Sequence, residues 1–177
     1  MKKHYHDQQK TICPYCRQEL KTTHGRHWDI EHVIPRVTVS NFMFDGYNLC
    51  VACVDCNGEK SDKKVTNSTA KQHYPKNPQS FLFVHPILDD YDKYIIVIEK
   101  GLFYYPLEEK GKNTIEICGL NRFYQYAGYT YQMDVFERIQ MLTNHAQTVT
   151  CSKTQTQLLE EIAALSLRSI VSKKKTA

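Results

Sequence analysis

The sequence predicts an α+β fold in which a small metal-bound core is followed by a β-rich extension and a helical C-terminal section. Two CxxC pairs bracket an interval of 36 residues. In this region residues 29–34 and 47–51 alternate as short strands do, and residues 57–64 have the composition of an exposed helix. We therefore expect a strand–strand–helix core in residues 1–75, an extension in residues 76–132 and helices in residues 133–177.

The first element of the core is a cysteine cluster. Each CxxC turn can present two thiolates to one ion, so the two turns together complete the tetrahedral site that structural zinc prefers. The predicted ligands are Cys13, Cys16, Cys53 and Cys56. A redox pair is the alternative, but no thioredoxin-like βαβ pattern surrounds either CxxC. Cys50 also forms a CxxC with Cys53, yet it lies in the predicted second strand, where a small buried thiol is the ordinary expectation, as it is for Cys118 and Cys151.

The second feature of the core is the pair Glu31-His32 on the first predicted strand. Phosphodiester cleavage near neutral pH needs a base that activates water and a cation that offsets developing charge. A neutral imidazole at His32 can take the proton, and the hard carboxylate oxygens of Glu31 can hold Mg²⁺ or Mn²⁺. We call the four predicted zinc ligands, Cys13, Cys16, Cys53 and Cys56, the clasp. Asn57 directly follows the last of them and can supply another oxygen. Asp29 shares the strand face of Glu31, so it can assist or replace Glu31 as a ligand.

These motifs, taken in order, resemble the HNH endonucleases over about residues 10–65. The resemblance rests on the two CxxC pairs, on residues 30–35 around Glu31-His32, on Asn48 and on the run from Asn57 to Lys60. It implies a ββα-metal core in which His32 is the general base, Glu31 and Asn57 hold a catalytic divalent ion, and Asn48 braces the loop around the histidine. The chain departs from the family pattern in having Glu where Asp is commoner and Asn57 where the family name has His.

Lysines follow Asn57 on the predicted helix. Lys60, Lys63 and Lys64 are candidate contacts for backbone phosphates, which add affinity without sequence choice. The alternative is an ordinary solvated helix face. Residues 1–76 hold twelve Lys and Arg against eight Asp and Glu, whereas residues 77–177 hold eleven of each, so the whole excess of +4 lies in the N-terminal part. This placement suits a polyanionic partner such as DNA.

The extension is predicted to contain a β-hairpin. Residues 94–98 and 102–105 are strand-like runs that flank Gly101, and residues 114–118 alternate as a third strand would. The acidic segment at residues 85–91 resembles a metal site at first sight, but a turn with an aromatic anchor explains it better. Beyond residue 133, apolar residues such as Leu158, Ile162 and Leu165 recur at helical spacing.

Segments of the extension also resemble the HNH effectors of bacterial anti-phage systems of the Septu type, including those attached to retrons. The similar segments are residues 81–94 and 111–122. This resemblance implies an effector that cuts DNA and associates with a partner ATPase and a retron ribonucleoprotein, with the helical section as a docking surface.

Composition excludes other classes. With 41% hydrophobic residues the chain can bury one core with an appendage. No run reaches the roughly 18 apolar residues of a membrane span, and the polar first ten residues lack a signal-peptide core. We expect a cytoplasmic protein. The competing hypothesis is a non-catalytic zinc module that binds nucleic acid or protein, but such a module has no need of Glu31-His32 and Asn57 together.

Overall fold

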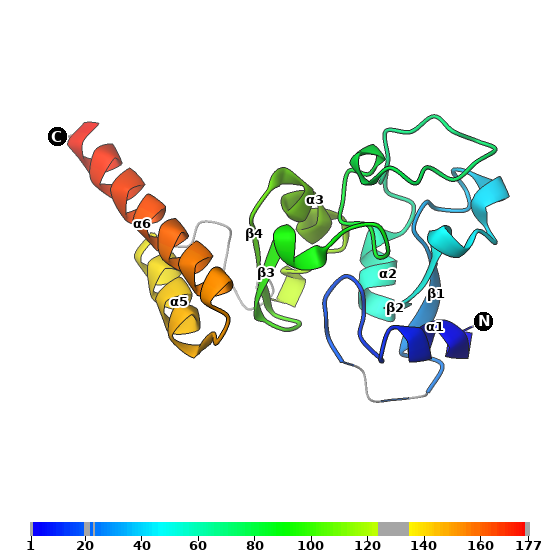
Figure 1. Cartoon of the computed structure of the whole chain (residues 1–177), viewed down its shortest axis with the longest axis horizontal. Helices are drawn as coiled ribbons and strands as arrows, with labels where there is room; N and C mark the ends of the chain where they lie inside the picture. The colour runs from blue at the N-terminus through cyan, green and yellow to red at the C-terminus, as the bar shows by residue number, and fades with distance from the viewer. Residues whose placement is uncertain (1, 20–21, 23, 124–134, 176–177) are drawn as a thin grey trace. The chain divides into compact units, whose positions relative to one another are not determined.

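The computed structural model describes residues 2–19, 22, 24–123 and 135–175 (Figure 1). The chain forms two compact units, Met1–Phe123 and Tyr124–Ala177. The predicted boundary between residues 132 and 133 lies outside the described residues. Both the core that was predicted to bind zinc and most of the predicted extension therefore belong to the first unit.

The core of the first unit is a strand–strand–helix motif. Strand β1 (Trp28–His32) pairs antiparallel with β2 (Leu49–Cys53), and Glu31 lies opposite Cys50 in the register. Helix α2 (Val54–Lys60) begins directly after β2 and packs against both strands. The α+β class and the ββα order predicted from the sequence are confirmed.

Helix α2 lies three residues earlier than the sequence predicted. It starts at Val54 because the Cys53 thiol accepts the backbone N–H of Cys56 and so caps the helix. It ends at Lys60 because Ser61 adopts a φ of 45°, outside the helical region. The prediction of a helix over residues 57–64 was therefore wrong at both ends, and Lys63 and Lys64 lie beyond the helix.

A short N-terminal helix, α1 (Lys2–Gln8), covers the outer edge of β2. The residue after it, Gln9, pairs with the backbone of Val51 through both ends of its side-chain amide, at 2.7 and 2.8 Å. These two hydrogen bonds satisfy backbone groups of β2 that a strand at the edge of a sheet would otherwise leave to water.

The extension consists of a hairpin and a helix. Strand β3 (Ile95–Glu99) pairs antiparallel with β4 (Phe103–Pro106), and Gly101 has the φ of 80° that the turn requires. Short 3-10 turns precede these strands or join the core strands, at Ser40–Phe42, Gly46–Asn48, Pro78–Ser80 and Tyr91–Lys93.

The third strand predicted at residues 114–118 is instead part of helix α3 (Glu109–Ile117). Gly111, Thr114, Ile115 and Cys118 are buried, which is the three-and-four spacing of a helix face packed on β4. The Thr114 hydroxyl donates to the Lys110 carbonyl one turn earlier. The alternation of Ile115 and Ile117 misled the prediction because tertiary packing overrides short periodic patterns.

Buried tyrosines join the extension to the cysteine turns. Tyr91 donates to the carbonyl of Tyr15 at 2.8 Å, and Tyr104 donates to the carbonyl of Cys16 at 2.5 Å. Both side chains belong to the same buried cluster as the clasp cysteines. The extension therefore supports the turn that carries the first CxxC.

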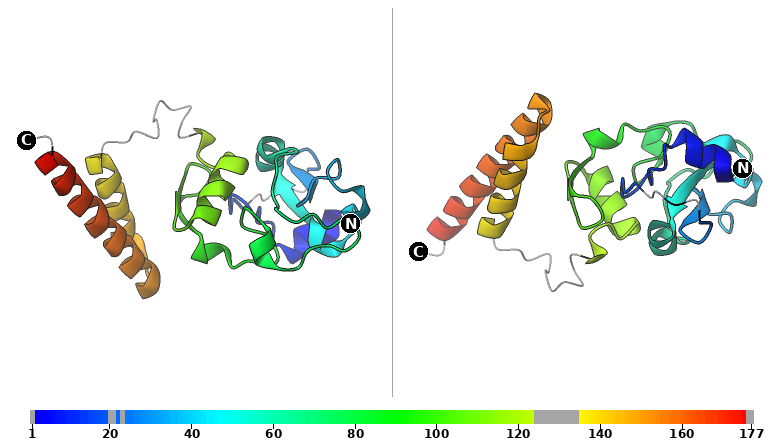
Figure 2. Two further views of the ribbon diagram at one scale, coloured as in Figure 1. Left: turned by 90° about the horizontal axis from the view of Figure 1, so that it is seen from above. Right: turned by 90° about the horizontal axis from the view of Figure 1, so that it is seen from below.

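The second unit is a helical hairpin of α5 (Val135–Thr148) and α6 (Ser152–Lys175). The two helices lie side by side in both views of Figure 2 and contact each other along their length. Leu142, Ala146, Leu158 and Leu165 are buried. The predicted helical section is present, although Cys151, expected to be buried, is exposed. No helix in the described part of the chain has the length and apolar character that crossing a membrane requires.

Candidate active site and metal clasp

The predicted cysteine ligands converge on one point. The Sγ atoms of Cys13, Cys16, Cys53 and Cys56 all lie within 4.8 Å of one another, and all four residues are buried. Zinc–sulfur bonds of about 2.3 Å at tetrahedral angles place neighbouring sulfurs about 3.8 Å apart, and the Sγ atoms of Cys16 and Cys53 are separated by 3.8 Å. The donor set and its dimensions fit a zinc-type ion. Cys50 points instead toward Tyr15 and lies outside the cluster.

The clasp determines where α2 lies. Cys53 ends β2 and Cys56 lies in the first turn of α2, so the ligands of one ion span the junction between strand and helix. Because α2 also contacts β1, the residues that follow Cys56 are held against the strand that carries Glu31 and His32. An ion at the clasp would thus stabilise the geometry of the adjacent site.

His32 is the half-buried last residue of β1. Its Nε2 lies 3.2 Å from the carbonyl oxygen of Met43, which can only accept, so Nε2 carries the proton. The lone pair is then on Nδ1. Burial lowers the pKa of His32, the hydrogen bond to Met43 opposes this, and the charges of Arg36 and Lys60 add to the lowering. The imidazole is therefore neutral at neutral pH and can accept a proton at Nδ1.

Glu31 is buried and held by a charge partner. The ammonium of Lys60 lies 2.6 Å from Oε1 of Glu31 and donates to the carbonyl of His32 at 3.0 Å. The Tyr15 hydroxyl also donates to Oε1, at 3.4 Å. Burial raises the pKa of Glu31, and the attraction of Lys60 opposes part of that rise. Lys60 thus joins the side chain of Glu31 to the backbone of His32.

Asn57 lies one turn before Lys60 on α2, and its side chain contacts Asp29 on β1. Its side-chain N–H donates to Oδ2 of Asp29 at 2.9 Å, which leaves the amide oxygen of Asn57 available as a ligand. Asp29 and Glu31 are two residues apart on β1, and Asn57 and Lys60 are three residues apart on α2. The contact between helix and strand therefore pairs Asn57 with Asp29 and Lys60 with Glu31. The structure brings Asn57 next to Asp29, the residue weighed as an alternative to Glu31.

Asn48 is fully buried and links the two sides of the loop between the core strands. Its amide oxygen accepts the backbone N–H of Ile34 at 2.7 Å, and its amide nitrogen donates to the carbonyls of Ile34 and Phe42, at 3.2 and 3.0 Å. The loop after His32 is therefore tied to the segment that supplies the Met43 carbonyl. These contacts match the bracing role that the family resemblance implies.

Glu31 and His32 open onto a solvent-reachable pocket of about 300 Å³. The rest of its lining comes from the loop after β1 and the turn after α2: Pro35, Arg36, Val37, Ser61 and Asp62. A base, a carboxylate and an exposed guanidinium at one opening can bind and activate a phosphodiester.

Of the predicted phosphate contacts, Lys63 and Lys64 are exposed but Lys60 is not. Lys60 is 1% exposed and engaged with Glu31, so it is unavailable to backbone phosphates. The sequence reasoning also missed Tyr15 and Arg36. A signal for Lys60 was present, because residues three apart on a helix share a face and Asn57 was already assigned to the face toward β1.

Comparisons with known proteins agree with this geometry. Residues 13–63 match the HNH endonuclease family, so the segment that contains the clasp, Glu31-His32 and Asn57 is an HNH endonuclease domain. The chain is also similar to the Septu protein PtuB of Bacillus thuringiensis, with 27% identity over 113 residues, which is 62% of this chain and 37% of that protein. The chain thus spans little more than a third of the length of this relative. No solved structure matches significantly.

Proposed function

We propose that the protein is a divalent-metal-dependent endonuclease that hydrolyses DNA phosphodiester bonds at the pocket beside His32. The observation that carries the proposal is the orientation of His32. Its Nε2 is committed to the Met43 carbonyl, so Nδ1 is left as a neutral base at a solvent-reachable pocket within an HNH domain. The bracing of the loop by Asn48 keeps the Met43 carbonyl in reach.

His32 would remove a proton from the water that attacks phosphorus. Asn57, with Glu31 or Asp29, would hold the divalent ion, Mg²⁺ or Mn²⁺, through hard oxygen donors. When bound, that ion supplies stabilisation of charge on the departing oxygen. Lys60 keeps Glu31 and the backbone of His32 in a constant relation. The clasp, with Zn²⁺ as the proposed ion, keeps α2 in place.

The test is cleavage of plasmid DNA with Mg²⁺ or Mn²⁺ by the wild-type chain and by His32→Ala. We expect the rate to fall by roughly 10²- to 10⁴-fold, which is the contribution that general-base catalysis makes. The variant should retain one equivalent of zinc and the wild-type circular dichroism spectrum. Undiminished cutting by a folded His32→Ala chain would refute the assignment.

The similarity to PtuB supports a narrower proposal, in which the nuclease is the effector of a Septu-type anti-phage system in the cytoplasm and acts with a partner PtuA-like ATPase. A retron ribonucleoprotein as a further partner is a prediction from the resemblance alone. Co-purification of the tagged chain with the ATPase encoded beside its gene tests the partnership. A stable complex supports it, whereas two species that elute separately at micromolar concentration count against it.

A second candidate is a non-catalytic zinc module that binds DNA. It is favoured by one observation, the engagement of Glu31 with Lys60, since a module without chemistry can also bury that pair. The two candidates differ in the plasmid assay. A module would bind DNA with the same affinity in wild type and His32→Ala and would cut with neither.

A further inference from the structure

A groove of about 290 Å³ adjoins the pocket beside His32. One wall is the loop after β1, residues 34–39, and the other is the segment after α2, residues 62–71. The groove and the pocket share Pro35 and Asp62 in their linings, so the two hollows are neighbours on the surface. Ser61, which lines the pocket, turns the chain out of α2 with its φ of 45° and directs it along the groove.

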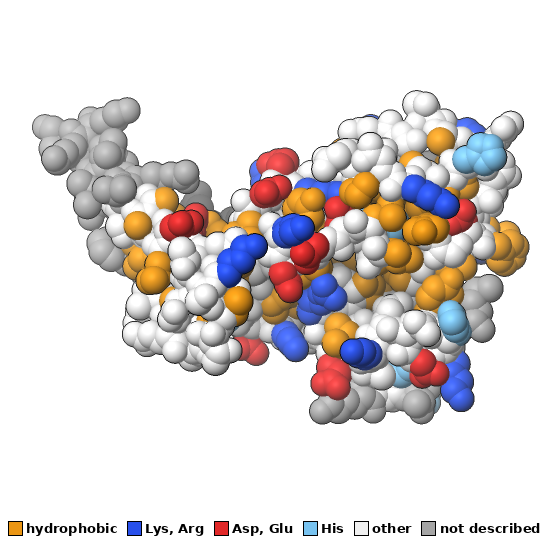
Figure 3. Space-filling model, viewed as in Figure 1, with side chains coloured by type: hydrophobic (Ala, Val, Ile, Leu, Met, Phe, Trp, Pro, Cys, Tyr) orange, Lys and Arg blue, Asp and Glu red, His pale blue; other side chains and the backbone are white. Residues whose placement is uncertain are grey.

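The groove carries an excess of positive charge. Lys63, Lys64 and Lys71 line it, and Arg36 lines the adjoining pocket. Two carboxylates line the same hollows, Asp62 at their junction and Glu31, which is already paired with Lys60. Lys60 adds nothing to this surface, because it is buried with Glu31. Figure 3 shows blue and red side chains interspersed over the face of the molecule that it draws. A local excess beside the proposed site indicates a polyanionic ligand there.

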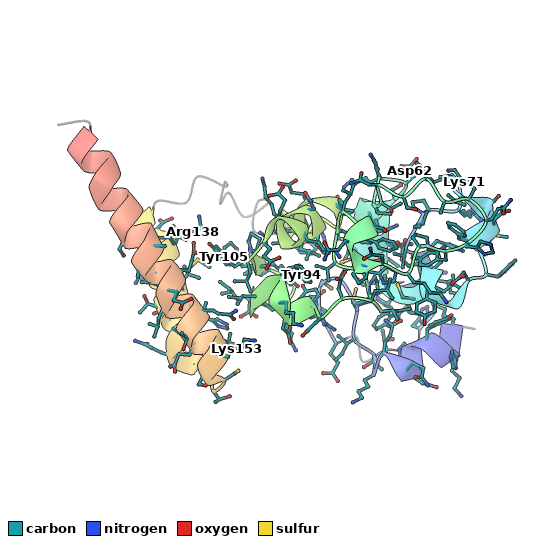
Figure 4. The ribbon with its side chains drawn as sticks, turned by 45° about the horizontal axis from the view of Figure 1, so that its top comes forward. Asp62, Lys71, Tyr94, Tyr105, Arg138 and Lys153 are labelled. Carbon is teal, nitrogen blue, oxygen red and sulfur yellow. The ribbon has the colours of Figure 1, made fainter. Side chains whose placement is uncertain are left out.

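Backbone carbonyls hold two of these lysines, and no carboxylate in the described part of the chain forms an ion pair with Lys63, Lys64 or Lys71. Lys71 donates from Nζ to the carbonyl of Thr38 across the groove at 3.5 Å, and its own carbonyl accepts from Asn41 at 3.0 Å. Lys63 donates to the carbonyl of Ile117 at 2.9 Å. A carbonyl partner leaves the charge and the remaining N–H donors of an ammonium free for a phosphate. Figure 4 shows the labelled side chains of Asp62 and Lys71 near each other on this part of the first unit.

The outer part of the groove lies beyond the family domain. The HNH match ends at residue 63, so Lys64 and Lys71 belong to a segment that the family does not define. That segment is anchored to the extension: Leu82 donates to the Val65 carbonyl at 2.8 Å, and the Thr66 hydroxyl donates to the Ser80 carbonyl at 2.6 Å. The extension therefore anchors the segment that forms the basic wall beside the nuclease core.

We propose that a strand of the substrate DNA leaves the pocket at His32 along this groove, with its backbone phosphates contacting Lys64 and Lys71. This inference rests on the proposed nuclease function and adds the path of the substrate. Contacts to phosphates alone predict affinity without sequence preference, because the backbone is the same at every position.

The test compares Lys64→Gln/Lys71→Gln with a matched control, Lys100→Gln/Lys112→Gln. The control removes the same charge from two exposed lysines that line neither the groove nor the pocket. Binding of fluorescent duplex DNA is measured by anisotropy across salt concentrations, with Mg²⁺ present and in a His32→Ala background so that the DNA stays intact. Cleavage kinetics are measured with the same substitutions and His32 intact.

We expect the groove variant to bind about tenfold more weakly at about 0.1 M salt, with the slope of log affinity against log salt reduced by about two. In cleavage the apparent KM should rise while kcat stays within about twofold. The control variant should match the chain without lysine substitutions, which we call the parent chain, in both DNA binding and cleavage. An RNA duplex of the same sequence shows whether the groove distinguishes the two backbones.

The outcomes separate this inference from the nuclease proposal. If the parent chain cuts DNA and the groove variant matches it in affinity and salt slope, the path is wrong and the nuclease stands. If the parent chain binds DNA but never cuts, while the groove variant alone loses affinity and slope, the groove binds nucleic acid and the nuclease proposal fails. A parent chain without measurable affinity for DNA overturns the path.

Discussion

Two lysine–carboxylate pairs of equal length lie in the first unit, one buried and one largely buried, and their surroundings differ. Lys60 meets Glu31 and Lys110 meets Asp89, each at 2.6 Å. The first pair touches the backbone of His32, and Glu31 lines a solvent-reachable pocket. The second is enclosed by a turn. Burial of a charge pair therefore does not by itself mark a reaction centre, and we propose one only where a neutral base lies beside the pair at an open pocket.

The contacts around Asp89 show what the second pair does. Asp89 also accepts the backbone N–H of His85 at 2.7 Å, and Lys110 donates to the carbonyl of Pro78 at 2.8 Å. The Nδ1 of His85 accepts the N–H groups of the next turn, and its Nε2 lies 2.8 Å from the Tyr74 hydroxyl. The side chains of His85 and Asp89 are thus engaged by protein groups, and among the described residues only the four cysteines form a group with metal-ligand geometry. The segment at residues 85–91 is therefore a hydrogen-bonded turn.

The two pairs should differ most in how well the structure around them survives removal of the zinc clasp. In Cys53→Ala or after zinc chelation, we expect the core to unfold locally, because structural zinc contributes on the order of 10 kcal/mol to small domains. Hydrogen exchange of β1, β2 and α2 should rise to the unprotected rate, while α5 and α6 keep their protection. The pair at Lys60 should be lost in this way before the pair at Lys110.

The control for this prediction is Cys118→Ala, a buried cysteine outside the clasp. It should retain one equivalent of zinc and protection in β1. Equal protection of β1 with and without zinc would contradict the role given to the clasp.

The next effect compares Lys60→Met with Lys110→Met. Each leaves a buried carboxylate without its partner, so we expect each to lower the free energy of unfolding by about 3–5 kcal/mol, measured by urea denaturation. Cleavage per folded molecule should differ. We expect it to fall at least tenfold in Lys60→Met, because Glu31 and the His32 carbonyl lose their common donor, and to remain near wild type in Lys110→Met.

The double variant Asp89→Leu/Lys110→Met provides the matched control, since replacing both members of a buried pair is often close to neutral. It should recover most of the lost stability and cut normally. If Lys110→Met lost as much cleavage per folded molecule as Lys60→Met, the distinction between the two pairs would be wrong.

A third effect is a pH dependence of the free energy of unfolding, which arises from His85 beside the second pair. Burial lowers the pKa of His85 from 6.5 to about 4, with Lys110 also lowering it and Asp89 opposing. The unfolded chain therefore binds more protons than the folded one between these values, and the free energy of unfolding falls as pH drops from 6.5 toward 4. The loss is up to about 3 kcal/mol.

Urea denaturation at a series of pH values, with the zinc content recorded at each, measures this loss. His85→Gln should have lower stability at neutral pH and a shallower decline in acid. Because zinc release in acid is common to both chains, the difference between the two curves isolates His85. Parallel curves would show that His85 is not the titrating group.

The smallest expected effect concerns the first pair and tests whether Glu31 or Asp29 holds the proposed catalytic ion. Asn57 contacts Asp29, whereas Glu31 is engaged with Lys60. Titration with Mn²⁺ should show roughly 10- to 100-fold weaker binding for the variant that removes the ligand, Asp29→Asn or Glu31→Gln, with zinc retained in both. Equal affinities in the two variants and the wild type would remove both residues from the proposed ion site.

Much of this fold was predictable because its signals are local. The CxxC spacing, the strand alternation, the glycine turn at Gly101 and the apolar repeat in α6 each depend on neighbours in the chain, and the structure contains each of these elements. The strand predicted at residues 114–118 was wrong because a five-residue alternation is also compatible with a helix face once Thr114 and Ile115 pack on β4.

The sequence by itself determined the components of the site: four cysteines at ligand spacing, a base beside a carboxylate, and Asn57 directly after the last cysteine. Only the tertiary structure decided their partners. Whether Lys60 reaches Glu31 or solvent depends on how α2 packs against β1, and the two residues are 29 positions apart in the sequence. The groove depends likewise on residues 62–71 lying across from residues 34–39. Pairings of this kind follow from the packing of whole elements, and no short sequence pattern encodes them.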